Sequence, residues 1–79
     1  MAYNPTEVKE MLTNELLRAR KKHSHWPVDT VHRAAILADQ AGGILREALP
    51  ALEGKADNRQ LEAEVLHTAV VCIRWLEGG

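Results

Sequence analysis

The sequence contains a single cysteine and no long apolar run. One cysteine cannot form a disulfide within the chain, and the apolar neighbours of Cys72 (Val70, Val71 and Ile73) predict a buried thiol. No stretch approaches the roughly 18 apolar residues of a membrane span, and residues 1–5 lack the charged-then-apolar pattern of a signal peptide. We therefore expect a cytoplasmic protein without a membrane partner.

The sequence also has almost no net charge. Ten basic side chains stand against eleven acidic ones, so no overall field attracts nucleic acid or anionic lipid, and we expect no specific nucleic-acid binding. Positive charge is concentrated in one stretch that contains Arg18, Arg20, Lys21, Lys22, His23 and His25. Such a stretch can neutralise a few phosphates, or it can be a solvated helix end whose cations complement the helix dipole.

The length allows one domain, residues 1–79. A chain of this size buries only about 60% of the surface that its unfolded form exposes, so it is marginally stable by itself. Because no disulfide is possible, a metal or further copies of the chain must supply any additional stability.

The first helix is predicted from Pro5 to about Lys22. Asn4 is a capping residue, proline follows at the first helical position, and Glu7 completes a capping box. One side carries three-and-four spacing at Val8, Met11, Leu12, Glu15, Leu16 and Ala19. Residues 23–27 form a connector, because the residue before Pro27 is disfavoured in a helix.

The second helix is predicted to start at Asp29 or Thr30. Its expected inner side consists of Val31, Ala34, Ala35, Ala38, Ala41, Leu45, Ala48 and Leu49. Gly42 and Gly43, in its middle, each cost about 1 kcal/mol relative to alanine. They mark a kink, a close helix crossing, or positions from which side chains have been lost. Pro50 is expected to kink or end the helix.

A turn is predicted at residues 53–55, followed by a third helix with Asp57 as its cap and Gln60 in a capping-box position. Apolar residues between Val65 and Leu76 cover most of the circumference of this helix, so it must be surrounded. Two helices of the same chain cannot surround it well. We therefore expect an all-α chain, a leading helix plus a helical hairpin, that packs as a dimeric or tetrameric bundle.

Carboxylates and histidines at helical spacing are the candidates for chemistry, because the sequence has no phosphate-cradling glycine loop and no nucleophile elbow. Asp39 and Glu47 share one side of the second helix and are placed to reach a common groove. Glu64 and His67 form a Glu-x-x-His pair, which is a usable metal half-site. The histidine would shift preference from magnesium toward manganese or zinc. Alternatively, these are ordinary polar positions in a narrow interface.

Two runs of the sequence resemble a known family. The run Ala35–Leu45 looks like the first metal-binding helix of the MazG-like, all-α nucleoside triphosphate pyrophosphohydrolases, which typically reads Ile-Leu-x-Glu-Glu-x-Gly-Glu. The run Leu61–Glu77 is similar to the second helix of phage-type members, with a glutamate, then Leu-x-x-Thr-x-Ala and an Arg-aromatic-Leu ending. Residues 16–20 and 25–27 are similar to their leading helix and connector, so the resemblance covers most of the chain.

The resemblance implies a bundle in which carboxylates of two helices hold magnesium ions against a triphosphate, and an activated water cleaves between the α and β phosphates. By position, Asp39, Gln40 and Gly43 stand where the family has three glutamates. Glu64 is the unchanged first acid of the second helix, and His67 replaces a frequent aspartate. Each lost carboxylate weakens magnesium binding, so the resemblance implies a depleted metal site.

Two functions follow from the resemblance. In one, a residual site with Mg²⁺ or Mn²⁺ still binds or hydrolyses a nucleotide and releases pyrophosphate. The implied metal ligands are Asp39, Glu64 and His67, with Gln40 and Glu47 as additional candidates. The implied nucleotide contacts are Lys21, Lys22 and Arg74 on phosphates and Trp26 on a base, although Trp26 beside Pro27 also suits a hydrophobic plug. In the other, which we favour, catalysis is lost and the fold serves as an oligomeric nucleotide-binding or scaffold module.

Overall fold

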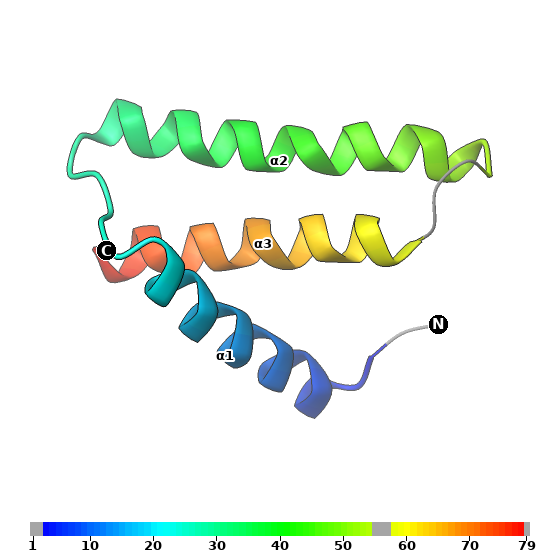
Figure 1. The fold of residues 1–79 in the computed structure, drawn as a ribbon, viewed down its shortest axis with the longest axis horizontal. Helices are drawn as coiled ribbons and strands as arrows, with labels where there is room; N and C mark the ends of the chain where they lie inside the picture. Colours follow the sequence, from blue (N-terminus) through cyan, green and yellow to red (C-terminus); the bar gives the residue numbers. More distant parts are fainter. Residues whose placement is uncertain (1–2, 55–57, 79) are drawn as a thin grey trace.

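The structure is a computed structural model that describes residues 3–54 and 58–78. Three α-helices follow one another: α1 spans Pro5–Lys22, α2 spans Thr30–Leu52 and α3 spans Asn58–Glu77. The second and third run antiparallel to each other, and α1 lies obliquely across α3 near its C-terminal end (Figure 1). The predicted all-α fold, a leading helix followed by a hairpin, is therefore confirmed.

Helix α1 begins at the predicted capping box. The Asn4 side-chain oxygen accepts a hydrogen bond from the Glu7 backbone N–H at 2.9 Å, and the Glu7 carboxylate accepts one from the Asn4 N–H at 3.1 Å. These bonds satisfy two of the backbone donors that every helix start leaves without partners. The helix ends at Lys22, and the His23 N–H still donates to the Ala19 carbonyl at 2.8 Å.

Helix α2 begins at Thr30, as predicted, with Asp29 as its cap. The Asp29 carboxylate accepts a hydrogen bond from the His32 backbone N–H at 3.1 Å. The helix includes Pro50 and ends two residues later, at Leu52. Gly54 then adopts a positive φ of 74°, a conformation that glycine tolerates best. Lys55 of the predicted turn and Asp57, the predicted cap of the third helix, lie outside the described residues.

Helix α3 is the central element. It packs against α2 along one side and against α1 along another, whereas α1 and α2 do not contact each other. Among the described residues, Val70 and Arg74 have the only buried side chains, each 3% exposed, and both belong to α3. A single chain therefore has a very thin core of its own.

The face of α2 that packs on α3 differs from the predicted one. Val31, Leu45 and Leu49, on the expected inner side, are 75%, 62% and 54% exposed. The helix instead turns Gln40 and Gly43 toward α3, where the Gln40 amide donates to Glu64 Oε2 at 2.7 Å. A Cβ at Gly43 would lie 2.6 Å from the same oxygen, so this glycine marks the close approach of a side chain from α3.

The prediction that Cys72 is buried is wrong, because its thiol is exposed. Val65, two turns before Cys72, and Leu76, one turn after it, lie on the same side of α3 and are 50% and 87% exposed. Neither α1 nor α2 covers this third side of the helix. The apolar neighbours of Cys72 in the sequence therefore belong to different faces.

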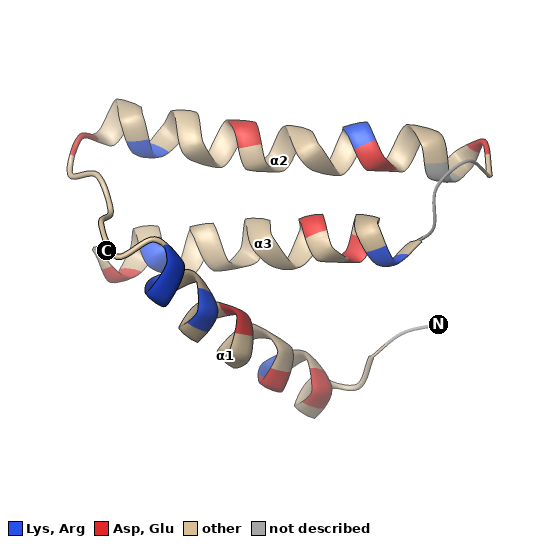
Figure 2. Ribbon diagram, in the orientation of Figure 1, with Lys and Arg blue, Asp and Glu red and all other residues tan. Residues whose placement is uncertain are grey.

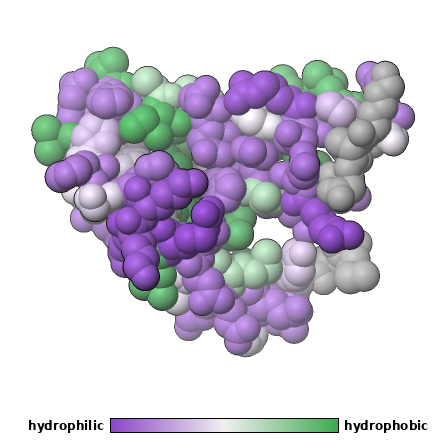
Figure 3. Space-filling model, viewed as in Figure 1, coloured by the Kyte–Doolittle hydropathy of each residue, from purple (hydrophilic) through white to green (hydrophobic). Residues whose placement is uncertain are grey.

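Charged and hydrophobic side chains are distributed unevenly over the surface. Lys and Arg gather on the last turns of α1, whereas Asp and Glu lie toward its beginning (Figure 2). Along the edge formed by α2, hydrophobic atoms are visible toward both ends, with hydrophilic atoms between them (Figure 3). No helix of the described residues is long and apolar enough to cross a membrane.

Candidate functional site

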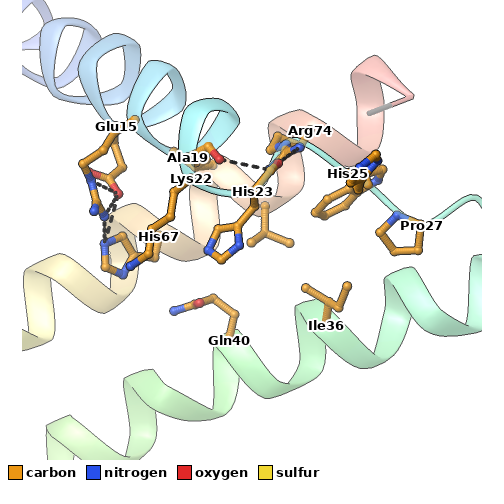
Figure 4. A pocket seen from close by; sticks show the side chains of 14 residues that line it. Glu15, Ala19, Lys22, His23, His25, Pro27, Ile36, Gln40, His67 and Arg74 are labelled. Carbon is orange, nitrogen blue, oxygen red and sulfur yellow. Dashed lines mark hydrogen bonds and ion pairs between the residues drawn. The ribbon is translucent and has the colours of Figure 1, made fainter.

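A pocket of about 450 Å³ lies between α1, the connector that follows it, α2 and α3. It exists because α1 and α2 both pack on α3 but not on each other, so α3 forms the floor between two separate walls. Ile36 and Gln40 point from α2 toward α1 and the connector (Figure 4). The volume falls within the range of about 300–1,000 Å³ that is typical of small-molecule sites.

Positive charge dominates the lining of this pocket. Arg18 and Lys22 come from α1 and Arg74 from α3, whereas Glu15 is the one carboxylate among the described lining residues. Three histidines also line it, namely His23, His25 and His67. Each histidine adds positive charge when it is protonated. The pocket is therefore suited to an anion.

Arg74 is a buried cation at the wall of the pocket. Its guanidinium donates to the His23 carbonyl at 2.8 Å and to the Ala19 carbonyl at 3.5 Å, which are the carbonyls at the end of α1. Its Cζ lies 4.9 Å from the centroid of the Trp26 ring. The negative end of the α1 dipole and the face of the indole both favour a cation here.

Two buried hydrogen-bond donors belong to Arg74 and to the neighbouring Trp26. Neither Arg74 Nε nor Trp26 Nε1 makes a hydrogen bond within the described part of the chain, although both atoms are buried. Carbonyl dipoles and an aromatic ring compensate Arg74, and no carboxylate of the described residues forms an ion pair with it. Buried charges usually have an ionic partner, so this arrangement leaves an unbalanced positive charge.

Glu15 links α1 to α3 within the same pocket. Its carboxylate accepts hydrogen bonds from Arg18 at 2.5–3.2 Å and lies 3.1 Å from His67 Nε2. The hydrogen bonds from Arg18 lower the pKa of Glu15, assisted by the charges of Arg18 and His67, while burial acts in the opposite direction. The ionised form of Glu15 therefore stabilises the contact between α1 and α3.

This lowered pKa predicts an acid-dependent loss of stability. The contribution of Glu15 should be complete above the unfolded-state pKa, about 4.3, and should disappear as the pH falls through the lower folded-state pKa. Glu15→Gln should therefore be less stable than the wild type at pH 7 and nearly equal to it at pH 2.5, as measured by urea unfolding. The matched variant Glu10→Gln, at an exposed position of α1, should stay within about 0.5 kcal/mol of the wild type. An equal loss for Glu15→Gln at both pH values would contradict the prediction.

The structure brings only two of the predicted metal ligands, Gln40 and Glu64, into direct contact within the described residues. Glu64 accepts the hydrogen bond from Gln40, whereas His67 lies against Glu15 and Arg18. Asp39 is exposed, and Glu47 is half-buried. No three His, Cys, Asp or Glu side chains within residues 3–54 and 58–78 are grouped so that they would hold a metal ion. The described residues of a single chain therefore do not bring together the several carboxylates that a divalent cation prefers.

The predicted nucleotide contacts are largely brought together. Lys22, Trp26 and Arg74 line the pocket, although they come from α1, the connector and α3. Lys21 is exposed and does not line it. Trp26 is half-buried beside Pro27 and against Arg74, so it contributes to the wall of the pocket in either of its predicted roles.

Glu15 was not among the predicted site residues. In the sequence, Glu15 is the one charged residue among the apolar residues at three-and-four spacing on α1. A carboxylate in such a pattern could have indicated that Glu15 has a specific partner. Its partner His67 is more than fifty positions away. Only the packing of α1 on α3 joins them.

No protein-family model, curated protein or solved structure matches this chain. The resemblance to MazG-like pyrophosphohydrolases therefore stays a prediction.

Proposed function

We propose that this chain is a homo-oligomeric helical module that binds a small phosphorylated ligand, such as a nucleotide, without hydrolysing it. The observation that carries the proposal is Arg74, a cation with 3% exposure at the wall of a 450 Å³ pocket, without a carboxylate partner among the described residues. A bound phosphate would supply the missing negative charge.

The other cations of the pocket support an anionic ligand. Arg18 is already paired with Glu15, so its charge is largely balanced. Lys22 makes no such ion pair with the residues that the structure describes, and it extends from the end of α1 along the pocket (Figure 4). A lysine ammonium with a flexible stem is a common phosphate contact. Among the described lining residues, Lys22 and Arg74 are thus the two lysine or arginine side chains without a carboxylate partner.

Binding is favoured over hydrolysis because few carboxylates remain at the positions where a metal would bind. Magnesium-dependent cleavage of a triphosphate needs several carboxylates around the metal. In this chain the Glu64 carboxylate accepts a hydrogen bond from the Gln40 amide. Gly43, at the position of the third glutamate of the resembled family, has no side chain that could bind a metal. These features suit a MazG-like module with a depleted site. Divalent-metal-dependent pyrophosphohydrolysis, with Mg²⁺ or Mn²⁺ as cofactor, is the alternative.

Titration calorimetry with ATP, AMP, pyrophosphate and adenosine tests the proposal. We expect heats of binding for phosphorylated compounds and none for adenosine, because the pocket offers cations. Lys22→Ala should weaken binding about tenfold, which corresponds to one charge-assisted contact of about 1.4 kcal/mol. The matched control is Lys21→Ala, since Lys21 is the adjacent exposed lysine outside the pocket. Equal effects of the two variants, or binding of adenosine as tightly as ATP, would refute the proposal.

Release of pyrophosphate separates binding from the alternative. The wild-type chain incubated with deoxynucleoside triphosphates and Mg²⁺ or Mn²⁺ is expected to release none. Metal-dependent release that disappears in Glu64→Gln would establish the hydrolase instead.

A further inference from the structure

An apolar stripe runs along the whole outer side of α2. It occurs at three-and-four spacing and consists of Val31, Ala34, Ala38, Ala41, Leu45, Leu49 and Leu52. All seven are exposed, including Leu52 at 86%. In Figure 3, hydrophobic atoms are visible toward both ends of this edge of the molecule, with hydrophilic atoms between them. The stripe contains no charged residue and lies away from Gln40 and Gly43, which face α3.

The chain exposes more surface than a compact protein of its mass. Its accessible surface is 5912 Å², whereas a compact monomer of 8.8 kDa exposes about 4,800 Å². The excess of about 1,100 Å² is comparable to the roughly 800 Å² that each partner loses in a standard specific interface. The radius of gyration, 13.6 Å, likewise exceeds the value of about 11.6 Å for a compact chain of this length.

The side chains of the stripe differ in size between its two halves. The first half carries alanines, and the second half carries Leu45, Leu49 and Leu52. A second α2 placed antiparallel, with a two-fold axis between Ala41 and Gly42, sets every large residue against a smaller one. In that register Leu45 meets Ala38 of the second copy, Leu49 meets Ala34, and Leu52 meets Val31. Such alternation of large and small residues allows two helices to interdigitate closely.

A parallel arrangement lacks this complementarity. It would place leucine against leucine at one end and alanine against alanine at the other, so the axes would diverge or leave a void.

Charges beside the stripe agree with the antiparallel register. Asp39 and Arg46 lie on the same edge of α2, and both are exposed. A two-fold axis of this kind brings equal edges of the two helices together. Arg46 of one copy then stands within about two residues of Asp39 of the other, and the symmetry repeats this pair. Opposite charges therefore flank the apolar contact.

We propose that the outer face of α2 binds a second copy of this chain, antiparallel and centred between Ala41 and Gly42. This inference rests on the assembly of copies in the proposed function, but it does not depend on ligand binding in the pocket, which lies on the α3-facing side of α2. The dimer covers the stripe and leaves the pocket open in each copy.

Disulfide trapping tests the register. In a Cys72→Ser background, Ala41→Cys should form a covalent dimer under mild oxidation, because the two thiols lie beside the two-fold axis within disulfide reach. Ala34→Cys should not trap itself, since the two copies of this position are about 22 Å apart along the axis. A mixture of the single variants Ala34→Cys and Leu49→Cys should give the mixed dimer. All three positions are exposed in the single chain, so the substitutions leave its own core intact.

Sedimentation of the full chain supplies the second measurement. The wild type should be dimeric at micromolar concentration, and Leu45→Glu should raise the dissociation constant at least tenfold. The matched control, Leu17→Glu on α1, changes a side chain of similar exposure, 60% against 62%, and should leave the constant unchanged. A monomeric wild type would overturn both this interface and the proposed assembly. An oligomer in which Ala34→Cys traps itself, or Ala41→Cys does not, would overturn this interface alone.

Discussion

Replacing Arg74 with alanine is expected to lower the free energy of unfolding by about 2–3 kcal/mol, the range for lost hydrogen bonds from a charged group together with lost packing. Arg74 donates to the Ala19 and His23 carbonyls at the end of α1 and packs on Trp26. It therefore holds α1, the connector and α3 together. Urea unfolding followed by circular dichroism measures the change.

Two further variants separate the roles of Arg74. Arg20→Ala is the matched control, because Arg20 also joins α1 to α3, through Glu77, but does so at the exposed surface. Such a pair contributes little, so this variant should remain within about 0.5–1 kcal/mol of the wild type. Arg74→Met keeps the packing of the stem and should recover part of the stability, but it should not restore ATP binding. If Arg74→Ala were as stable as the wild type, the capping of α1 by Arg74 would be irrelevant to stability.

The double variant Gln40→Glu/Gly43→Glu is expected to gain metal-dependent stability that the wild type lacks. Gln40 already contacts Glu64, and the Cβ of residue 43 would point at the Glu64 carboxylate, which can shift because it is the end of a flexible side chain. Three carboxylates would then converge. Without metal their repulsion should lower the melting temperature.

Manganese at about one hundred times its dissociation constant should then stabilise the double variant by about 2.7 kcal/mol. For a domain of this size that corresponds to a rise in melting temperature of at least about 10 °C. The control Asn14→Glu/Leu17→Glu places the same charges at the same spacing on an exposed side of α1, away from both α3-facing and dimer-facing sides of α2, and should show no such rise. Equal responses of the two double variants would show that the groove between α2 and α3 is not the remnant of a metal site.

Local signals predicted the helices well. The capping residue Asn4, the proline at position 5 and the loss of helical preference before Pro27 all act within one or two turns. Their positions in the chain therefore determine where α1 begins and where it ends, and the structure places both boundaries, and the start of α2, where the sequence predicts them.

The orientation of α2 was predicted wrongly for a physical reason. Apolar periodicity identifies an apolar side, but it does not say whether the same chain or another one covers it. Gln40 contacts Glu64 beside Gly43, so this side of α2 faces α3. Leu45, Leu49 and Leu52 consequently lie on the exposed side. The exposure of Cys72 has the same origin, since α3 has more apolar sides than two helices cover.

The candidate site shows a similar division. Residue types and the family resemblance drew attention to Lys22, Trp26 and Arg74, and these residues meet at one pocket. The sequence did not indicate that Arg74 would be buried without a carboxylate, or that Glu15 would bind His67. Both facts depend on the angle at which α1 crosses α3.

The sequence by itself determined an all-α chain with one cysteine, nearly balanced charge and three helices, the first two of which begin at local caps. Only the tertiary structure decided which helical faces meet, which charges are buried and where a pocket remains. Local hydrogen bonds and backbone preferences operate over a few residues, whereas burial and charge balance depend on residues brought together from distant positions. For this protein, that difference separates the helices, which were predictable, from the cation-lined pocket and the outward leucines of α2, which were not.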